Sequence, residues 1–497
     1  MNPFLIPLTL LCFTVANLLT CYLYIYPVVQ GCAFPSPPVK PPPNPYRPPI
    51  DPGPAPFRLL VLGDPQLEGD SSLLFNAEDG HFPTLRRIYK TPSFQHVKEL
   101  ITHDLFILLQ YWRKKLDLLG NDYYLAHIYR TLSSFTYPTH VAVLGDLLGS
   151  QWVSDEEFDL RGRRYWGRVF QRGRRIDDSI TDTITRTSLA DEDELAPWKD
   201  RVINVAGNHD IGYAGDMSAE KLDRFERVFG KANWESRFAL PPPPSHPSTA
   251  AVPSPEIRLV ILNSLNLEAP ALSTELQHST YDFLNEMIAN ADPVEDTSAA
   301  MVLLTHLPLH KAAGICVDRP LISYYSGEHG GGVREQNHLS PGSSKNILEG
   351  LYGMSGDANA PALGMGRDGI ILTGHDHEGC DVYHYIPRGY PGGEWEAERL
   401  NKTNVYKAQE RTAGLREITV RSMMGDFGGN AGLLSGWFDY AEGRWHFEYE
   451  ACALGTQHIW WAIHVFDLVT LGLMNFTWWA SRREARRMRV GEQKKTQ

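Results

Sequence analysis

The chain alternates between short apolar runs and longer polar stretches, and a fully apolar segment lies near each end. Short runs rich in Val, Ile and Leu favour buried strands, and apolar residues spaced three and four apart favour helices. Strands are predicted at residues 58–62, 141–144, 202–205, 257–263, 301–304, 369–372 and 416–421. Helices are predicted at residues 96–119, 121–130, 154–171, 214–230 and 273–291. In the first of these helices we expect a buried stripe made of Leu100, Leu105, Leu108 and Leu109. Strands that alternate with helices predict an α/β fold.

Five of these strands share one feature, a polar side chain at the carboxyl end. The segments that follow them read Gly-Asp-Pro-Gln, Gly-Asp, Gly-Asn-His-Asp, Thr-His-Leu-Pro and Thr-Gly-His-Asp-His. One such turn after a core strand is ordinary. Five of them indicate a common site, because open α/β sheets place their sites at the carboxyl ends of strands. The candidate residues are Asp64, Gln66, Asp146, Asn208, His209, Asp210, His306, His375 and His377.

In order and content, the five motifs resemble those of the calcineurin-like metallophosphoesterases over residues 57–380. The chain is most similar to the membrane-anchored branch of the endoplasmic reticulum that removes ethanolamine phosphate from the glycan of glycosylphosphatidylinositol (GPI) anchors. Segments 63–66, 145–149, 374–380 and 422–429 carry this closer match. The resemblance implies a four-layer α/β/β/α sandwich of two mixed sheets, with a transmembrane helix at each end.

The resemblance also implies a dinuclear metal site in which Asp146 bridges the two ions. The first ion would be held by Asp64, Asp146 and His377, and the second by Asp146, Asn208, His306 and His375. Two divalent cations neutralise phosphate oxygens and lower the pKa of a bound water, so they suit phosphate-ester hydrolysis. We expect Mn²⁺, with iron or zinc as alternatives.

The remaining candidates have roles beside the metals. His209 would stabilise the transition state or protonate the leaving oxygen. Asp210 would support the turn or orient a ligand histidine as an acceptor. Gln66 stands where the superfamily usually has histidine and would be a weaker ligand; fungal members of the closer branch share it. His310 would contact substrate phosphate or simply pack, and the same alternatives hold, with less weight on substrate, for His384.

Two segments are apolar enough to cross a membrane. Residues 5–26 carry no charge and would span about 33 Å as a helix, although a cleaved signal peptide is the alternative. Residues 459–480 are bracketed by tryptophans, as interfacial belts are, although a surface amphipathic helix is the alternative. Asp467 within that segment is a candidate functional residue, or it pairs with His464.

The basic tail after the second segment orients the chain. Arginines there should stay cytosolic, which places both termini in the cytosol and the intervening domain in the lumen. We expect these parts: an anchor (1–29), a proline-rich spacer (30–56), a catalytic domain (57–455) with mobile insertions near 174–200, 241–255 and 327–364, a second span (456–480) and a tail (481–497). Lys494 and Lys495 resemble a dilysine signal read by coat proteins, with a merely basic tail as the alternative.

Composition changes this picture in three ways. The net charge of −12 argues against a nucleic-acid partner. Four cysteines lie outside the apolar segments, namely Cys32, Cys316, Cys380 and Cys452, and they allow three disulfide pairings. Asn401 begins an Asn-Lys-Thr glycosylation acceptor in a polar region that would be luminal.

The function expected from this sequence is a phosphodiesterase of the endoplasmic reticulum that acts on the GPI glycan and promotes export of GPI-anchored proteins, with cargo receptors as further partners. One alternative is a metallophosphoesterase for a nucleotide or a phosphoprotein. The other is a membrane scaffold for cargo export that keeps the fold without turnover. Hydrolysis of an aryl phosphodiester with Mn²⁺, with and without chelator, separates the enzyme from the scaffold.

Overall fold

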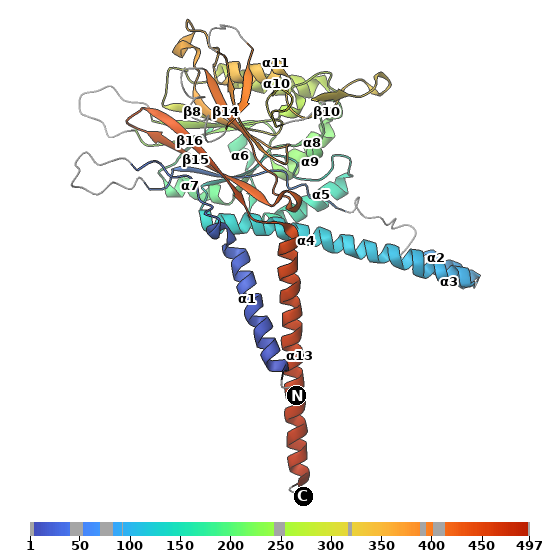
Figure 1. The fold of residues 1–497 in the computed structure, drawn as a ribbon. Helices are drawn as coiled ribbons and strands as arrows, with labels where there is room; N and C mark the ends of the chain where they lie inside the picture. The colour runs from blue at the N-terminus through green and yellow to red at the C-terminus, as the bar shows by residue number, and fades with distance from the viewer. Residues whose placement is uncertain are drawn as a thin grey trace, which may run out of the picture.

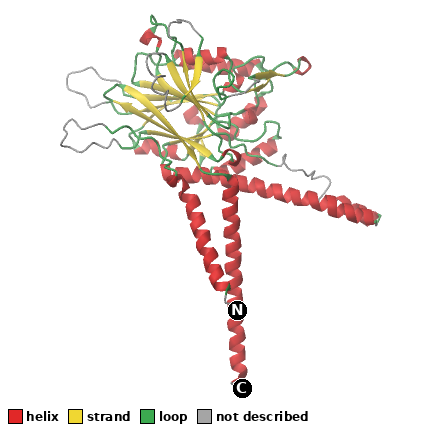
Figure 2. Ribbon diagram, in the orientation of Figure 1, coloured by secondary structure: helices red, strands yellow, loops and turns green. Residues whose placement is uncertain are grey.

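The computed structural model describes residues 4–39, 53–69, 83–91, 93–242, 254–316, 321–387, 394–400 and 413–495. Two large mixed sheets form its centre (Figures 1 and 2). The six-stranded sheet has the order β16-β15-β1-β2-β5-β3. Its strands are β1 (Phe57–Leu62), β2 (His140–Val143), β3 (Arg174–Arg175), β5 (Arg201–Asn204), β15 (Asn430–Asp439) and β16 (Arg444–Ala453). The four strands β1, β2, β5 and β3 run parallel to one another, and β15 is antiparallel to both of its neighbours, β1 and β16.

The eight-stranded sheet has the order β13-β12-β14-β11-β8-β7-β6-β4. Its strands are β4 (Thr185–Ser188), β6 (Trp234–Ala239), β7 (Glu256–Leu262), β8 (Ala299–Thr305), β11 (Asp368–Thr373), β12 (Cys380–Tyr385), β13 (Glu396–Arg399) and β14 (Gly414–Thr419). The central strands β14, β11, β8 and β7 are parallel. A separate two-stranded sheet pairs β9 (Ile322–Tyr324) with β10 (Val333–Gln336).

Side chains of each central strand alternate between two cores, because successive residues of a strand point to opposite faces. In β1, Leu59 and Val61 lie in a core between the two sheets, together with Leu259 of β7 and Val302 of β8. Leu60 and Leu62 point the other way and pack under the helices. Strands buried on both faces read as continuous apolar runs, which is the pattern in the sequence.

Helices cover the outer face of each sheet and complete four layers. The six-stranded sheet is covered by α4 (Leu105–Thr136), α5 (Asp155–Arg164) and α9 (Ala219–Phe229), and the eight-stranded sheet by α10 (Thr274–Ala289) and α11 (Pro341–Lys345). The other helices are α1 (Leu5–Val29), α2 (Pro83–Lys90), α3 (Phe94–Glu99), α6 (Asp178–Thr181), α7 (Glu192–Lys199), α8 (Asn208–Ile211) and α13 (Gln457–Lys495). The α/β/β/α sandwich predicted from the sequence is confirmed.

The longest helix of the domain, α4, differs from its prediction. It is continuous where two segments, 96–119 and 121–130, were predicted, and it follows α3 through a π-helical turn, η3 (Leu100–Asp104). The predicted buried stripe is wrong, since Leu105 is 41% and Leu109 61% exposed. Only the half of α4 from Gly120 onward packs on the sheet, and the other half extends beyond the domain (Figure 1).

Two of the predicted mobile insertions contain regular structure. Residues 174–200 supply β3 and β4 at the edges of the two sheets, and Trp198 of α7 is buried as part of the core between the sheets. Residues 327–364 include β10, α11 and a buried apolar turn, η7 (Asn346–Leu351). Their polar composition concealed a few well-spaced apolar anchors, which order these segments. In the third insertion, 241–255, residues 243–253 lie outside the described part, as do residues 40–52 of the proline-rich spacer.

The structure selects one of the three possible disulfide pairings. Cys32 bonds to Cys452, and Cys316 bonds to Cys380. The first bond joins the chain just after α1 to the end of β16, directly before α13. Both ends of the domain are thereby fastened at the place where the two apolar helices leave it.

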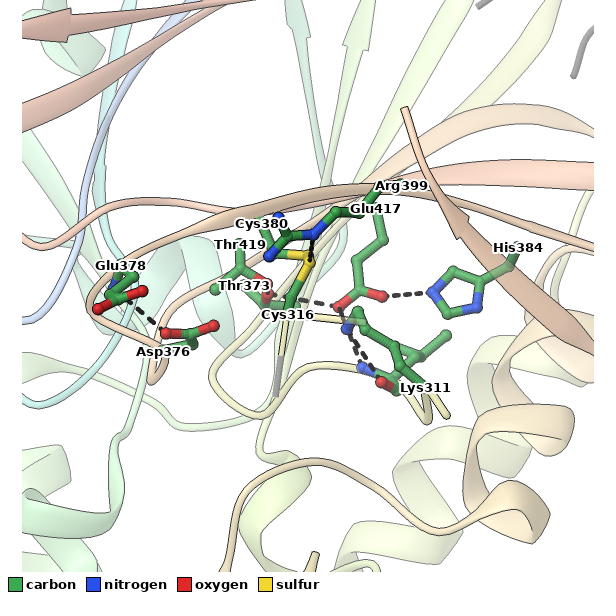
Figure 3. Close-up of a disulfide and its surroundings, with 11 residues drawn as sticks. Lys311, Cys316, Thr373, Asp376, Glu378, Cys380, His384, Arg399, Glu417 and Thr419 are labelled. Carbon is green, nitrogen blue, oxygen red and sulfur yellow. Dashed lines mark hydrogen bonds and ion pairs between the residues drawn. A yellow bond between two sulfur atoms is a disulfide. The ribbon is translucent and has the colours of Figure 1, made fainter. Parts of the chain in front are cut away.

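The second disulfide lies beside a buried ionic cluster (Figure 3). The Nζ of Lys311 donates to the Glu417 carboxylate at 3.0 Å, and the His384 ring contacts the other oxygen of that carboxylate. Burial favours the neutral acid, but Lys311 and His384 outweigh it and lower the pKa of Glu417 to about 2. His384 is therefore part of this buried cluster, which agrees with the alternative that it packs inside the protein and does not contact substrate.

The terminal helices α1 and α13 are both long and apolar enough to cross a membrane. They leave the same side of the domain and run beside each other (Figure 1). Two polar contacts join them: Thr20 Oγ1 donates to Asp467 Oδ2 at 2.8 Å, and the Thr9 and Thr477 hydroxyls lie 2.8 Å apart. Asp467 thus pairs with Thr20 instead of His464. α13 also continues through the predicted tail to Lys495.

Candidate metal centre

Five strand ends from both sheets meet at one site. In the first sheet the adjacent parallel strands β1, β2 and β5 bring Asp64, Asp146 and Asn208 to the same edge. In the second sheet β8 leads to His306, and its parallel neighbour β11 leads to His375 and His377. The site therefore lies where the carboxyl ends of two facing sheets converge.

Two groups of ligand atoms result, and they have one residue in common. The first group is Asp146, His306 and His375, and the second is Asp64, Asp146 and His377. Within each group the ligand atoms lie within 4.8 Å of one another. This is the arrangement that two neighbouring cations with one shared carboxylate require.

The hydrogen bonds of two histidines show which ring nitrogens are available to a metal. Nδ1 of His306 donates to the Leu144 carbonyl at 2.7 Å, and Nε2 of His375 donates to the Gln336 carbonyl at 2.8 Å. Because a carbonyl only accepts, each of these nitrogens carries the proton, and the other nitrogen keeps its lone pair. Metal-binding histidines are commonly fixed in this way.

Acceptor atoms face each other around His306. Its Nε2 lies 3.0 Å from Oδ1 of Asn208 and 3.4 Å from Oδ1 of Asp146. Three acceptors repel one another at such distances unless a cation lies between them. Ligands that each bind a transition metal at about 2.0–2.2 Å lie roughly 3 Å apart. The donor set therefore fits a divalent cation at this position.

The electrostatics of the site favour the same conclusion. The carboxylates of Asp64 and Asp146 are both buried, and burial together with the charge of Asp146 raises the pKa of Asp64 well above its usual value. Burial, and then the neighbouring His306, lowers the pKa of His375 to about 3, so this imidazole is neutral and able to bind a metal. Cations would relieve the repulsion between the carboxylates.

Several of these residues have an unfavourable backbone conformation. Positive φ values occur at Asp64 (47°), Gln66 (42°), Asp146 (48°) and His375 (73°). The left-handed region costs a non-glycine residue roughly 1–2 kcal/mol, and such strain is typical of functional sites. Gly207 shows how close the loops are, because a Cβ there would lie 2.0 Å from the Asp146 nitrogen.

Gln66 faces the ligands with its amide nitrogen. That nitrogen donates to Oδ2 of Asp146 at 3.0 Å and lies 3.2 Å from Nε2 of His377. It therefore holds in place two residues of the second ligand group, Asp146 and His377. The weak-ligand role predicted from the sequence would require the amide to turn its oxygen toward the metal.

His209 and Asp210 are adjacent in sequence but lie in different surroundings. The His209 backbone donates to Oδ1 of Asp146 at 2.9 Å, while its ring, 37% exposed, faces the cavity with Nε2 3.7 Å from Oδ2 of Asp146. Asp210 is fully buried and accepts hydrogen bonds from the backbone nitrogens of Leu147, Leu148 and Gly207. Of the two roles expected for Asp210, its contacts fit support of the turn.

Removal of the Asp210 carboxylate is expected to destabilise the protein. Asp210→Ala would leave three buried N–H groups without acceptors, each costing about 1–3 kcal/mol, so we expect a loss of at least ~3 kcal/mol in the free energy of unfolding. Thermal unfolding measures this loss, with Asp223→Ala, which removes an exposed carboxylate on α9, as the matched control. Equal unfolding midpoints for the two variants would contradict the role given to Asp210.

Four of the ligand residues, Asp146, Asn208, His375 and His377, line an open cavity of about 530 Å³. Its walls include residues that the strand-end motifs do not reveal: Trp152, Tyr213, Tyr325, Arg334 and Glu335. The pair β9–β10 brings Tyr325 and Arg334 to the opening. These residues lie in or beside a Gly-rich stretch, and no periodic pattern in the sequence distinguishes them from an ordinary loop.

The predicted site residue His310 is not among the residues that line this cavity. The His310 ring packs on His338, with centroids 4.9 Å apart, and its backbone nitrogen donates to Oγ of Ser344 at 2.8 Å. Burial, and then His384, lowers the pKa of His310. These contacts favour packing over contact with substrate phosphate. Asn401, the predicted glycosylation site, lies outside the described residues.

Comparisons with known proteins were made for the sequence and for the fold. No model of a protein family matches the chain. Protein TED1 of Saccharomyces cerevisiae is 34% identical over 412 residues, which cover 73% of this chain and 77% of that protein. Metallophosphoesterase 1 of Rattus norvegicus is 24% identical, over 58% of this chain and 61% of that protein.

Among solved structures, the chain is similar to a dimetal phosphatase from Danio rerio. The TM-score is 0.36 at 10% identity, with 81% of this chain and 98% of that one covered. The sequence match to TED1 is far stronger and extends over most of both proteins. The chain therefore belongs to the calcineurin-like metallophosphoesterases, which are hydrolases of phosphoric esters, and within them to the branch of TED1 and metallophosphoesterase 1 that its motifs predict.

Proposed function

We propose that the protein removes ethanolamine phosphate from a mannose of the GPI glycan in the lumen of the endoplasmic reticulum, and so promotes the export of GPI-anchored proteins. The observation that carries this proposal is the pair of ligand groups sharing Asp146 beside an open cavity. Membership of the branch of TED1 supports the choice of substrate. Ethanolamine phosphate is joined to mannose as a phosphodiester, the type of bond that two-metal sites cleave.

Two divalent cations, Mn²⁺ first and iron or zinc as alternatives, fit the two ligand groups. Asp64, Asp146 and His377 would hold one, and Asp146, Asn208, His306 and His375 the other. Bound there, they would neutralise phosphate oxygens and lower the pKa of a water. The mixture of carboxylate, carboxamide and imidazole ligands suits such metals better than Ca²⁺ or a thiolate-bound ion.

The chain's own groups would bind the substrate and move the proton. The exposed ring of His209 is the group placed to protonate the mannose oxygen as it leaves. The Arg334 guanidinium, which lines the cavity and pairs with Glu335 at 3.3 Å, can attract the phosphodiester anion. Gln66 would keep Asp146 and His377 oriented throughout.

The lumen is proposed on two grounds, and a retrieval signal is proposed beside them. The two disulfides favour an oxidising compartment. The arginines at the far end of α13 favour the cytosol for that end. Lys494 and Lys495 at the same end are proposed to bind coat proteins, and the side chains there lie outside the described part. The location of a variant with both lysines replaced by serine tests this signal, since retention in the endoplasmic reticulum would exclude it.

Cells that lack this protein are expected to retain one extra ethanolamine phosphate on their GPI-anchored proteins, which should leave the endoplasmic reticulum slowly. Mass spectrometry of the released glycan measures the substituent. Re-expression of the intact chain should restore the normal glycan, and re-expression of Asp146→Asn should not.

The outcomes separate the alternatives. If the deleted cells have a normal glycan and contain no related enzyme, the remaining alternative is a phosphoesterase that acts on a nucleotide or a phosphoprotein. Restoration by Asp146→Asn would favour the scaffold. Hydrolysis of an aryl phosphodiester by the purified protein with Mn²⁺, abolished by chelator, is the direct measurement of catalysis.

A further inference from the structure

We infer that the helical arm, residues 94–119, lies in the surface of the lipid bilayer with its apolar face in the acyl region. The arm consists of α3, η3 and the first half of α4, which extend beyond the domain (Figure 1). This inference rests on the proposed membrane anchoring, because it takes α1 and α13 as the spans.

The arm exposes an apolar face that repeats along the helix. Its exposed fractions are Ile101 59%, Leu105 41%, Leu109 61%, Trp112 53%, Leu116 56% and Leu119 38%. Successive members are three or four residues apart, so they lie on one side of the helix. A continuous set of large apolar side chains facing water marks an interaction surface, unlike scattered single residues.

The two spans contact α4 on the same side as this apolar face. The spacing continues from Leu116 to Gly120, Tyr123 and His127. Gly120 lies directly against the Trp461 ring of α13, since a Cβ there would be 1.6 Å from that ring. The His127 ring packs on the Tyr24 ring of α1 at a centroid distance of 4.9 Å. α4 thus crosses the ends of both spans (Figure 1). Because Gly120 and His127 continue the spacing of the apolar face, that face lies on the side of α4 that contacts the spans.

Apart from Phe106, which is 57% exposed, the other sides of the arm between Leu105 and Leu119 are mainly polar. On the opposite side, Lys114 pairs with Glu68 at 2.7 Å. At the borders of the apolar face, Arg113 and Lys115 are exposed. Long basic side chains at such borders reach the headgroup region while their stems stay in the apolar region.

These observations favour lipid over a protein as the occupant of the face. The face is continuous with the surface that the two spans already occupy, so a bilayer that surrounds α1 and α13 reaches it without any further component. Trp112 and the basic borders are typical of an interfacial helix.

The arm would also set the position of the metal centre relative to the membrane. Its polar side lines a cavity of about 390 Å³ together with Asp426, Trp461 and Gln66. Gln66 lines the catalytic cavity as well. The cavity above the arm would therefore lie between the metals and the membrane surface, where a lipid-linked glycan is anchored.

Spin-label accessibility in lipid nanodiscs of phosphatidylcholine tests this position with the full chain. Cys12→Ser and Cys21→Ser remove the free thiols, and the other four cysteines are in disulfides. Nitroxide is attached to Leu116→Cys on the apolar face, with Asp117→Cys, an exposed neighbour on a polar side, as the matched control. We expect the label at 116 to collide mainly with oxygen, which partitions into lipid, and the label at 117 with a water-soluble nickel complex.

A reference label at native Cys21, in a chain carrying Cys12→Ser, reports on the span itself. If this label is accessible to water, the proposed anchoring fails. If it lies in lipid while the label at 116 resembles that at 117, only the inference about the arm is overturned. A label at 116 shielded from both reagents would show that protein, from a partner or a second copy, covers the face, and it would likewise overturn the inference.

Discussion

Asp146→Asn is expected to reduce phosphodiester hydrolysis by roughly 10⁴-fold or more, as the loss of several kcal/mol of charge stabilisation implies. Asp146 is the residue common to both ligand groups, so the substitution removes negative charge from both. In the native protein the Gln66 amide donates to Oδ2 of Asp146 at 3.0 Å. The substitution introduces a second amide opposite this donor. Metal content should fall with turnover, and elemental analysis of the purified variant measures it.

Gln66→Ala is the control for this experiment, because it removes a neutral hydrogen-bond donor to the same carboxylate. The loss of one such bond corresponds to about 1–3 kcal/mol, so a considerably smaller fall in rate is expected. If both variants are folded and Gln66→Ala is the less active, Asp146 is not the shared ligand.

His209→Ala is expected to keep its metals and lose about 10²–10⁴-fold in turnover, the usual contribution of a general acid. Its ring faces the cavity, while the ligand atoms of both groups come from other residues. The loss should be largest for a sugar leaving group and smaller for a nitrophenolate, which leaves without a proton. The ratio of the two rates, measured on one preparation, separates proton donation from a general loss of structure.

His278→Ala, which removes an exposed histidine of α10, is the matched control and should retain full rate on both substrates. Metal content that falls in parallel with rate in His209→Ala would identify His209 as a ligand. Equal losses on the two substrates would show that His209 is not the general acid. Its remaining role would then be stabilisation of the transition state.

The sequence indicates the place of the site because the geometry of parallel strands is simple. Residues that follow β1, β2 and β5 must emerge at the same edge, so the sequence alone suffices to group Asp64, Asp146 and Asn208. It does not suffice for the Gln336 carbonyl that fixes His375, since the position of that carbonyl depends on how β10 folds back over the site. Residues such as Arg334 carry no periodic signal.

The prediction for α4 failed for a different reason. Periodicity correctly identified an apolar face containing Leu105 and Leu109, but it does not specify what covers such a face. The prediction assumed the protein core, whereas the helix extends past it. The disulfide pairing could not be predicted from the sequence either, because Cys32 and Cys452 become neighbours only when both ends of the domain are in place.

That pairing makes the domain a closed covalent ring, since the bonded cysteines are 420 residues apart in sequence. At about 5–20 residues per second of synthesis, Cys32 exists for roughly 20–80 s before Cys452 is made. During that time the Cys32 thiol must not form a disulfide with another thiol. The ring can close only after Cys452, in the last strand, has been translated. In the finished ring, one proteolytic cut between the two cysteines leaves both apolar terminal helices, α1 and α13, on a single covalently linked molecule. The fragments would migrate apart on a gel only after reduction.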